Sequence, residues 1–177
     1  QTHTELPPDL SAAELRAVET LRNAYGYAGQ AEMAWHPQTL FGLADSPVAL
    51  AAWLIDHDPI SYETLVAPAF VDGREGGLTR DDILDNTTLF WLTNTGVSAG
   101  RIYWEFKESW ATVRNVSIPV AVSNFPDDVV YSPLSWAEQA YPNLVHFNDT
   151  DRGGHFAAWE VPELYASELR DGLRSLR

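Results

Sequence analysis

The sequence predicts an α/β fold in two blocks, a helical block over residues 1–110 and a β-α-β-α block over residues 111–177. Helix caps and helically spaced apolar residues recur through the first block, which contains no convincing alternating strand. The second block has two β-rich segments, each followed by a helical one, and consecutive β-α units imply a parallel sheet. Parallel sheets are normally larger and covered on both faces, so we expect further strands to come from outside this chain.

The composition is that of an ordinary globular protein. The chain has 177 residues, of which 45% are hydrophobic and 7 are Trp, enough for a sizeable core. A net charge of -14 argues against nucleic-acid binding, because phosphates would repel it. With 0 cysteines there is no disulfide, thiol nucleophile or thiolate metal site. The longest apolar run, residues 48–55, is far below the roughly 20 residues that span a bilayer, and we expect a cytoplasmic protein.

A capping box marks the first helix. Residues 1–10 are polar and carry Pro7-Pro8, which predicts an extended or mobile start. Ser11-Ala-Ala-Glu14 then matches a capping box, and apolar residues continue at helical spacing to Arg22. His36-Pro37 ends any helix that comes before it, because the residue preceding a proline disfavours helical backbone angles.

Further caps mark the remaining helices of this block. Asp45-Ser46-Pro47 predicts the cap and first turn of the second helix in a pair. Thr79-Arg-Asp-Asp82 caps another helix. The predicted elements are the helix pair at residues 37–57, a short helix at 62–67, a helix at about 81–93 and a helix at 99–108.

Polar residues follow each predicted strand of the second block. Its predicted elements are a β-rich segment at 116–125, a helix at 135–140, a strand at 143–147 and a helix at 161–176. Asp127-Asp128 come just after the first strand, and Gly153-Gly154-His155 come just after the second. A carboxylate past one strand and a histidine past the next is how an α/β hydrolase presents two members of a catalytic triad.

His155 is the strongest candidate for chemistry. The two glycines before it permit a backbone that lifts the imidazole out of a loop, and a near-neutral base is what the activation of a hydrolytic water requires. The same pattern also fits a histidine that caps the following helix or packs in the core. Spacing alone does not separate Asp127 from Asp128, and both also fit as turn carboxylates that cap the next helix.

We expect no metal and no organic cofactor. The other histidines, His3, His36, His57 and His146, show no paired ligand spacing, and the chain has no glycine-rich phosphate loop. His57 lies between two aspartates and is more simply explained as part of a solvated helix end. His146 alternates with apolar strand residues, and we expect it to pack inside or to face a partner.

Several ordered motifs resemble those of a known family. The chain is similar to the C-terminal half of an epoxide hydrolase of the microsomal-type α/β hydrolase family, in its bacterial branch. The resemblance implies the α/β hydrolase fold, with residues 1–110 as the helical cap and residues 111–177 as the last two β-α units of the core. The motifs that carry it are Pro37-Gln-Thr-Leu40, residues 44–53, Arg101-Ile-Tyr-Trp-Glu105, Phe125-Pro-Asp-Asp128 and residues 153–160.

The resemblance assigns the acid and the base. The family pattern is Phe-Pro, then one intervening residue, then the acid as Asp or Glu, which selects Asp128 over Asp127. His155 is then the base that activates water, with Asp128 orienting its ring. We therefore expect the Asp128 carboxylate within roughly 2.6–3.2 Å of the His155 imidazole.

The resemblance also assigns two cap tyrosines that donate hydrogen bonds to the epoxide oxygen. Tyr103, in Arg-Ile-Tyr-Trp-Glu, matches one of them, and without the family it would be read as ordinary packing. The family spacing for the second tyrosine lands on Gly29, so Tyr27 fits only if about two residues are inserted, with Tyr25 as the second choice. We expect the hydroxyls of Tyr103 and Tyr27 to face His155.

The nucleophile is absent from the sequence, since no Gly-x-Ser-x-Gly or Gly-x-Asp-x-Gly elbow occurs. The resemblance implies that an N-terminal half, from the same precursor or a separate chain, supplies an aspartate nucleophile. The expected reaction converts a small apolar epoxide to a diol through an alkyl-enzyme ester. Self-association is left open. The rival hypotheses are another α/β hydrolase, such as a haloalkane dehalogenase or an esterase, and a non-catalytic half-hydrolase that serves as an interaction module.

Overall fold

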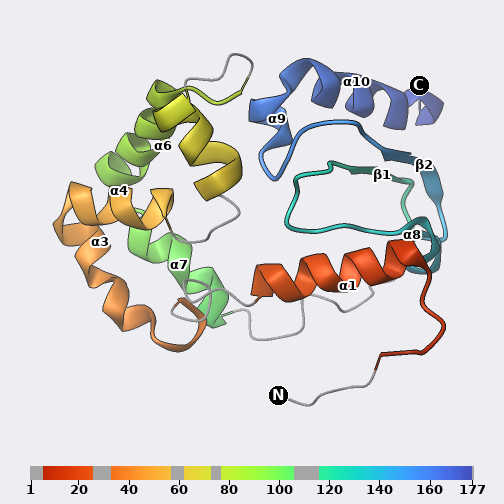
Figure 1. Ribbon diagram of the computed structural model, residues 1–177, viewed down its shortest axis with the longest axis horizontal. Coiled ribbons are helices and arrows are strands. Elements are labelled where there is room, and N and C mark those ends of the chain that lie inside the picture. The colour runs from red at the N-terminus through yellow and green to blue at the C-terminus, as the bar shows by residue number, and fades with distance from the viewer. Residues whose placement is uncertain (1–5, 26–32, 57–61, 73–76, 106–115, 177) are drawn as a thin grey trace. The chain divides into compact units, whose positions relative to one another are not determined.

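The chain divides into two compact units. The computed structural model describes residues 6–25, 33–56, 62–72, 77–105 and 116–176. Unit 1 comprises Gln1–Ala24, Val113–Ala158 and Pro162–Arg177, and unit 2 comprises Tyr25–Thr112 with Trp159–Val161. Figure 1 shows the strands of unit 1 and the helices of unit 2.

Unit 1 is built on two parallel strands, β1 (Val120–Asn124) and β2 (Leu144–Asp149), joined through helix α8 (Leu134–Ala140). Ala121 pairs with His146, and Asn124 pairs with Asp149. Helix α10 (Pro162–Gly172) packs against both strands, whereas α1 (Ala12–Tyr25) lies on the opposite side of the pair (Figure 1). The predicted β-α-β-α order and parallel pairing are confirmed.

The strand unit differs from the prediction in two details. The β-rich segment predicted from residue 116 becomes a strand only at Val120, because Pro119 has no N–H to give to a sheet ladder. The helix predicted over residues 161–176 is divided. Helix α9 (Ala157–Glu160) precedes α10, and a 3₁₀ turn, η4 (Arg174–Leu176), follows it.

Helix α1 groups with the strands, so the observed units depart from the predicted division at residue 110. The predicted capping box forms, with the Ser11 N–H donating to Glu14 at 2.8 Å. That bond and the hydroxyl of Ser135, which donates to the same carboxylate at 2.8 Å, lower the pKa of Glu14. The Arg16 guanidinium lies over the Tyr131 ring, 4.5 Å from its centroid. These contacts attach α1 to residues far along the chain, which helical spacing could not reveal.

Unit 2 is helical in every element that the structure describes there. The predicted helix pair consists of a 3₁₀ helix η1 (Pro37–Phe41) continued by α3 (Gly42–Asp45), and then α4 (Pro47–Ile55). Ser46 caps α4, accepting from the Ala49 N–H at 3.3 Å as its sequence predicts. The other elements are two π-helical turns, η2 (Tyr62–Val66) and η3 (Pro68–Asp72), and the helices α6 (Arg80–Thr93) and α7 (Gly96–Glu105).

The core of unit 2 forms where α7 approaches η1 and α4. Met33, Leu40, Leu43 and Leu50 are buried together. Two glycines on one face of α7 allow this approach, since a Cβ on Gly100 would lie 2.8 Å from Leu40 Cδ1 and one on Gly96 would lie 2.9 Å from Leu50 Cδ1. The spacing of these glycines, four residues, places both on the same side of the helix.

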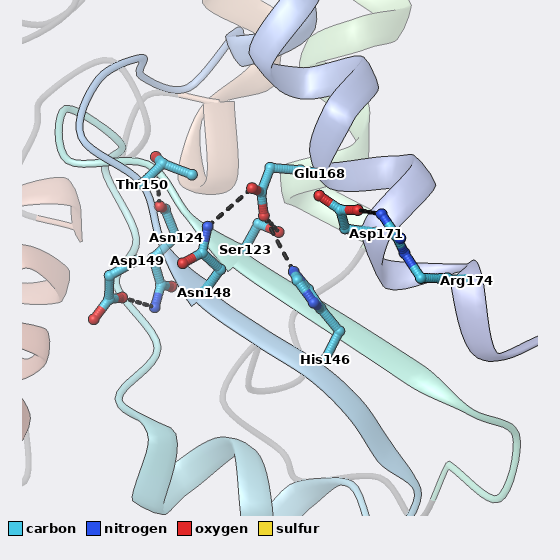
Figure 2. Close-up of polar contacts among 9 residues, drawn as sticks. All are labelled: Ser123, Asn124, His146, Asn148, Asp149, Thr150, Glu168, Asp171 and Arg174. Atoms are coloured by element: carbon cyan, nitrogen blue, oxygen red, sulfur yellow. Dashed lines mark hydrogen bonds and ion pairs between the residues drawn. The ribbon is translucent and has the colours of Figure 1, made fainter.

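A polar cluster ties α10 to both strands (Figure 2). The Glu168 carboxylate accepts hydrogen bonds from the Ser123 hydroxyl at 2.7 Å and the Asn148 amide at 2.9 Å, and it lies 3.2 Å from His146 Nε2. Burial alone would raise the pKa of Glu168, but the bonds from Ser123, His146 and Asn148, with the charge of His146, lower it. His146 is therefore packed inside its unit, one of the two placements predicted for it.

We expect Glu168→Gln to destabilise the chain at neutral pH by about 2 kcal/mol, because a charged acceptor of several bonds is lost. Since the pKa of Glu168 is lowered on folding, its contribution is present above the unfolded-state pKa and is lost as pH falls through the folded-state pKa. Urea unfolding at about pH 7 and about pH 3.5 should show the difference between wild type and variant shrinking at acid pH. Glu138→Gln, at an exposed position on α8, is the matched control. Equal differences at both pH values would contradict the assignment.

Candidate active site

The loops that follow β1 and β2 are joined by backbone hydrogen bonds. The Asp127 N–H donates to the Gly153 carbonyl at 3.1 Å, and Asp127 forms an isolated parallel bridge with Gly154. The Asp128 N–H turns back to the Phe125 carbonyl at 3.2 Å, and Asp128 Oδ1 accepts from the Val130 N–H at 3.2 Å. The parallel pairing thus continues briefly past the two strands. It fixes the position of the backbone immediately before Asp128.

Gly153 sets the backbone conformation of the loop that follows β2. Its φ of 98° lies in the left-handed region that favours glycine, and both Gly153 and Gly154 are buried. The Ala157 N–H then donates to the Gly154 carbonyl at 3.1 Å, which closes a turn at the start of α9. His155 stands in this turn and is exposed, as its sequence context predicts.

Asp128 and His155 meet across the two loops. Asp128 Oδ1 lies 2.8 Å from His155 Nδ1, within the predicted range, and this carboxylate belongs to Asp128, as the family pattern indicates. The Asp128 side chain is 26% exposed and the His155 side chain 51%, so the histidine opens to solvent while its partner is more enclosed. A carboxylate can only accept, so Nδ1 carries the proton in this bond with a neutral ring, and Nε2 is then the basic atom.

The phenyl ring of Phe156 flanks the histidine. The two ring centroids lie 5.1 Å apart with an interplanar angle of 74°, an edge-to-face contact. Phe156 is itself 48% exposed. An apolar ring beside a polar pair restricts the directions from which water can approach His155.

Of the two tyrosines predicted to face the epoxide, the structure describes only Tyr103. Tyr103 belongs to α7 and is half-buried against the core of unit 2. Tyr27 lies outside the described residues. The approach of their hydroxyls to His155 stays a prediction.

Sequence reasoning missed Asn124, the last residue of β1. Its side chain is buried, with 7% exposure, and bonds both to Ser132 beyond the Asp128 loop and to Asp149 at the end of β2. The available signal was the polar pair Ser123-Asn124 at the end of an otherwise apolar strand.

The ranges that the structure describes lack two further kinds of feature. No group of three or more His, Asp or Glu side chains there could hold a metal ion. Within the same ranges, no helix combines the length and the apolar character needed to cross a membrane.

Comparison with known proteins places these features in a family context. No protein-family model matches the chain. It is 41% identical over 175 residues to a Stigmatella aurantiaca protein assigned as an epoxide hydrolase, covering 96% of this chain and 38% of that protein. It is 35% identical over 137 residues to epoxide hydrolase 1 of Sus scrofa, covering 72% of this chain and 29% of that protein. The solved structure of Aspergillus niger epoxide hydrolase matches with a TM-score of 0.73 and 28% identity, over 98% of this chain and 44% of that one. The chain thus spans less than half the length of each of these relatives.

Proposed function

The chain is homologous to the C-terminal part of epoxide hydrolases of the α/β hydrolase fold, and we propose that it supplies the acid and the base of such an enzyme. The complete enzyme would consist of this chain and an N-terminal part that carries the nucleophile. Unit 1 would contribute to the catalytic core, and unit 2 would form the cap. The observation that carries this proposal is the 2.8 Å contact between Asp128 and His155, on loops that follow neighbouring parallel strands.

The first step of the proposed reaction opens the epoxide. A carboxylate oxygen of an aspartate in the N-terminal part attacks an epoxide carbon, the C–O bond to that carbon breaks, and an alkyl-enzyme ester forms. The negative charge that develops on the released oxygen needs a donor. Tyr103 would supply one hydrogen bond and the proton, and Tyr27 a second hydrogen bond.

The second step hydrolyses the ester. His155 Nε2 takes a proton from water, and the hydroxide attacks the ester carbonyl. Asp128 holds the ring through Nδ1 and stabilises the imidazolium that forms. Collapse of the tetrahedral intermediate breaks the bond to the alkoxide oxygen, which takes the proton of the added hydroxyl, so the diol leaves and the aspartate carboxylate is restored. The proton on His155 then returns to the tyrosinate left by the first step.

The need for an N-terminal part is supported by the strand unit itself. Its described sheet has two strands, so each strand keeps one edge without a sheet neighbour among the described residues. Apolar side chains beside or within these strands remain open, with Ile118 67% exposed and Val145 41% exposed. Together with the coverage of at most 44% of these relatives, this favours a second piece that continues the sheet.

A reconstitution experiment tests the proposed function. The chain alone should form no diol from a small aryl epoxide such as styrene oxide, because Asp128 and His155 have no ester to act on. The complete enzyme should form diol and should show the ester as a mass increase equal to the epoxide after acid quenching. Diol formation by the isolated chain at the rate of the complete enzyme would contradict the proposal. An acyl-enzyme formed on a serine from an ester substrate, with no adduct formed from the epoxide, would favour the esterase alternative.

A further inference from the structure

Asn124 is a buried side chain whose two amide N–H groups and carbonyl oxygen are all hydrogen-bonded. Its Nδ2 donates to the Ser132 carbonyl at 2.9 Å and to Asp149 Oδ1 at 2.7 Å, and its Oδ1 accepts from the Ser132 N–H at 3.1 Å. With 7% exposure, water cannot easily replace these partners. The arrangement is therefore specific for an amide, which is the side-chain group that both donates twice and accepts.

The same side chain closes the loop that carries Asp128. Asn124 and Ser132 are the two ends of this loop, and the amide bonds both the N–H and the carbonyl of Ser132, as a neighbouring strand would. Asp128 lies midway between these two ends. Pinning both ends restricts the positions that its carboxylate can take.

The backbone of Asn124 holds the loop that carries His155 (Figure 2). Its carbonyl accepts from the Thr150 N–H at 2.9 Å and from the Thr150 hydroxyl at 2.8 Å. Asp149, which accepts from the Asn124 amide, also accepts from the Tyr131 hydroxyl at 3.3 Å. Burial, followed by the charge of Asp149 and the bond to it, raises the pKa of Tyr131 and keeps the phenol a donor. Asn124 thus contacts both the loop that carries Asp128 and the loop that carries His155.

We propose that Asn124 is a positioning residue that sets the Asp128 carboxylate against the His155 imidazole. The inference rests on the proposed function, because it assigns to that pair the second step of the reaction. Asn124 touches neither reacting atom and acts only through the two loops. Ester formation uses groups outside these loops, whereas ester hydrolysis depends on the pair. Loosening the loops should therefore slow the second step and leave the first unchanged.

Single-turnover kinetics of the complete enzyme with styrene oxide separate the two steps. We expect Asn124→Ala to slow ester hydrolysis by about 10- to 100-fold, the size of effect that follows a displacement of about 1 Å, with ester formation unchanged. The matched control is Asn148→Ala on the paired strand, which removes one bond to Glu168 and no bond to either loop. Its ester should be hydrolysed at the wild-type rate. Equal hydrolysis rates in Asn124→Ala and Asn148→Ala would overturn the proposal.

A double variant distinguishes loss of the contact between Asn124 and Asp149 from a general loss of folding. Exchanging the pair, Asn124→Asp with Asp149→Asn, keeps the volumes and restores a donor and an acceptor between these positions. We expect this double variant to hydrolyse the ester faster than Asn124→Asp alone, in which two carboxylates face each other. Neither variant can donate to the Ser132 carbonyl, so the comparison isolates the contact with Asp149. No recovery in a folded double variant would overturn the part of the proposal that rests on that contact.

A spectroscopic measurement tests the positioning role without turnover. In protein labelled with ¹⁵N-histidine, the His155 Nδ1 signal reports its hydrogen bond to Asp128, and a His155→Gln sample identifies the signal. Asn124→Ala should shift it and Asn148→Ala should not. An unchanged signal in Asn124→Ala would overturn the inference even if the complete enzyme proved inactive towards epoxides. Inactivity of wild type with the predicted signal changes would instead overturn only the proposed function.

Discussion

Replacing Asp128 by Asn should lower kcat of the complete enzyme by about 10⁴-fold, the effect that loss of the orienting carboxylate has in a serine-protease triad. The substituted amide can donate to Nδ1, which moves the ring proton to Nε2 and removes the basic atom. Steady-state diol formation from styrene oxide would measure the loss. Ester formation should continue, because the proposed mechanism uses the Asp128–His155 contact, at 2.8 Å, only in the second step.

Asp127→Asn is the matched control, one residue away and of the same type. Asp127 contributes its backbone N–H to the Gly153 carbonyl, and an asparagine retains that bond. This variant should keep kcat near the wild-type value. A larger loss in Asp127→Asn than in Asp128→Asn would show that the acid has been misassigned.

His155→Gln should trap the alkyl-enzyme ester. Without a base to activate water, the second step should slow by about 10⁴-fold, while the nucleophile still opens the epoxide. Mixing enzyme and epoxide in equal amounts and quenching with acid should therefore give nearly complete conversion to the heavier enzyme. Wild type under the same conditions should return to its original mass.

His146→Gln is the control for this second substitution. His146 lies on β2 and bonds Glu168 through Nε2, a bond that a glutamine amide can also make. The variant should turn over epoxide normally. Accumulated ester in His146→Gln, or rapid turnover in His155→Gln, would contradict the assignment of His155 as the base.

Local signals in the sequence predicted much of this structure. The capping boxes at Ser11 and Thr79 mark helix starts because their bonds join residues three apart, and both form. The parallel strands follow from the β-α order alone. The pairing of Asp128 with His155 was predictable because parallel strands end at one edge of a sheet, and the motif around Phe125-Pro126 chose between two neighbouring aspartates.

The features that could not be predicted depend on contacts between residues far apart in the sequence. Asn124 reaches Asp149, 25 residues away, and Ser123 reaches Glu168, 45 residues away, so neither contact leaves a periodic trace in the sequence. The placement of α1 with the strands follows from bonds such as that of Ser135 to Glu14, 121 residues apart. Helical spacing describes which face of α1 is apolar but does not identify its neighbour.

The attachment of α1 to unit 1 has a consequence for how the chain is made. Unit 1 is interrupted in sequence by the long stretch of unit 2, so its first helix is synthesised well before its strands. On the ribosome, the helices of unit 2 can form from neighbouring segments while α1 still lacks the residues it binds. Ser135, Asp128 and His155 emerge only in the last third of the chain. Any nascent chain halted before them would carry a folded helical unit beside an unpaired α1, and it would contain neither the acid nor the base.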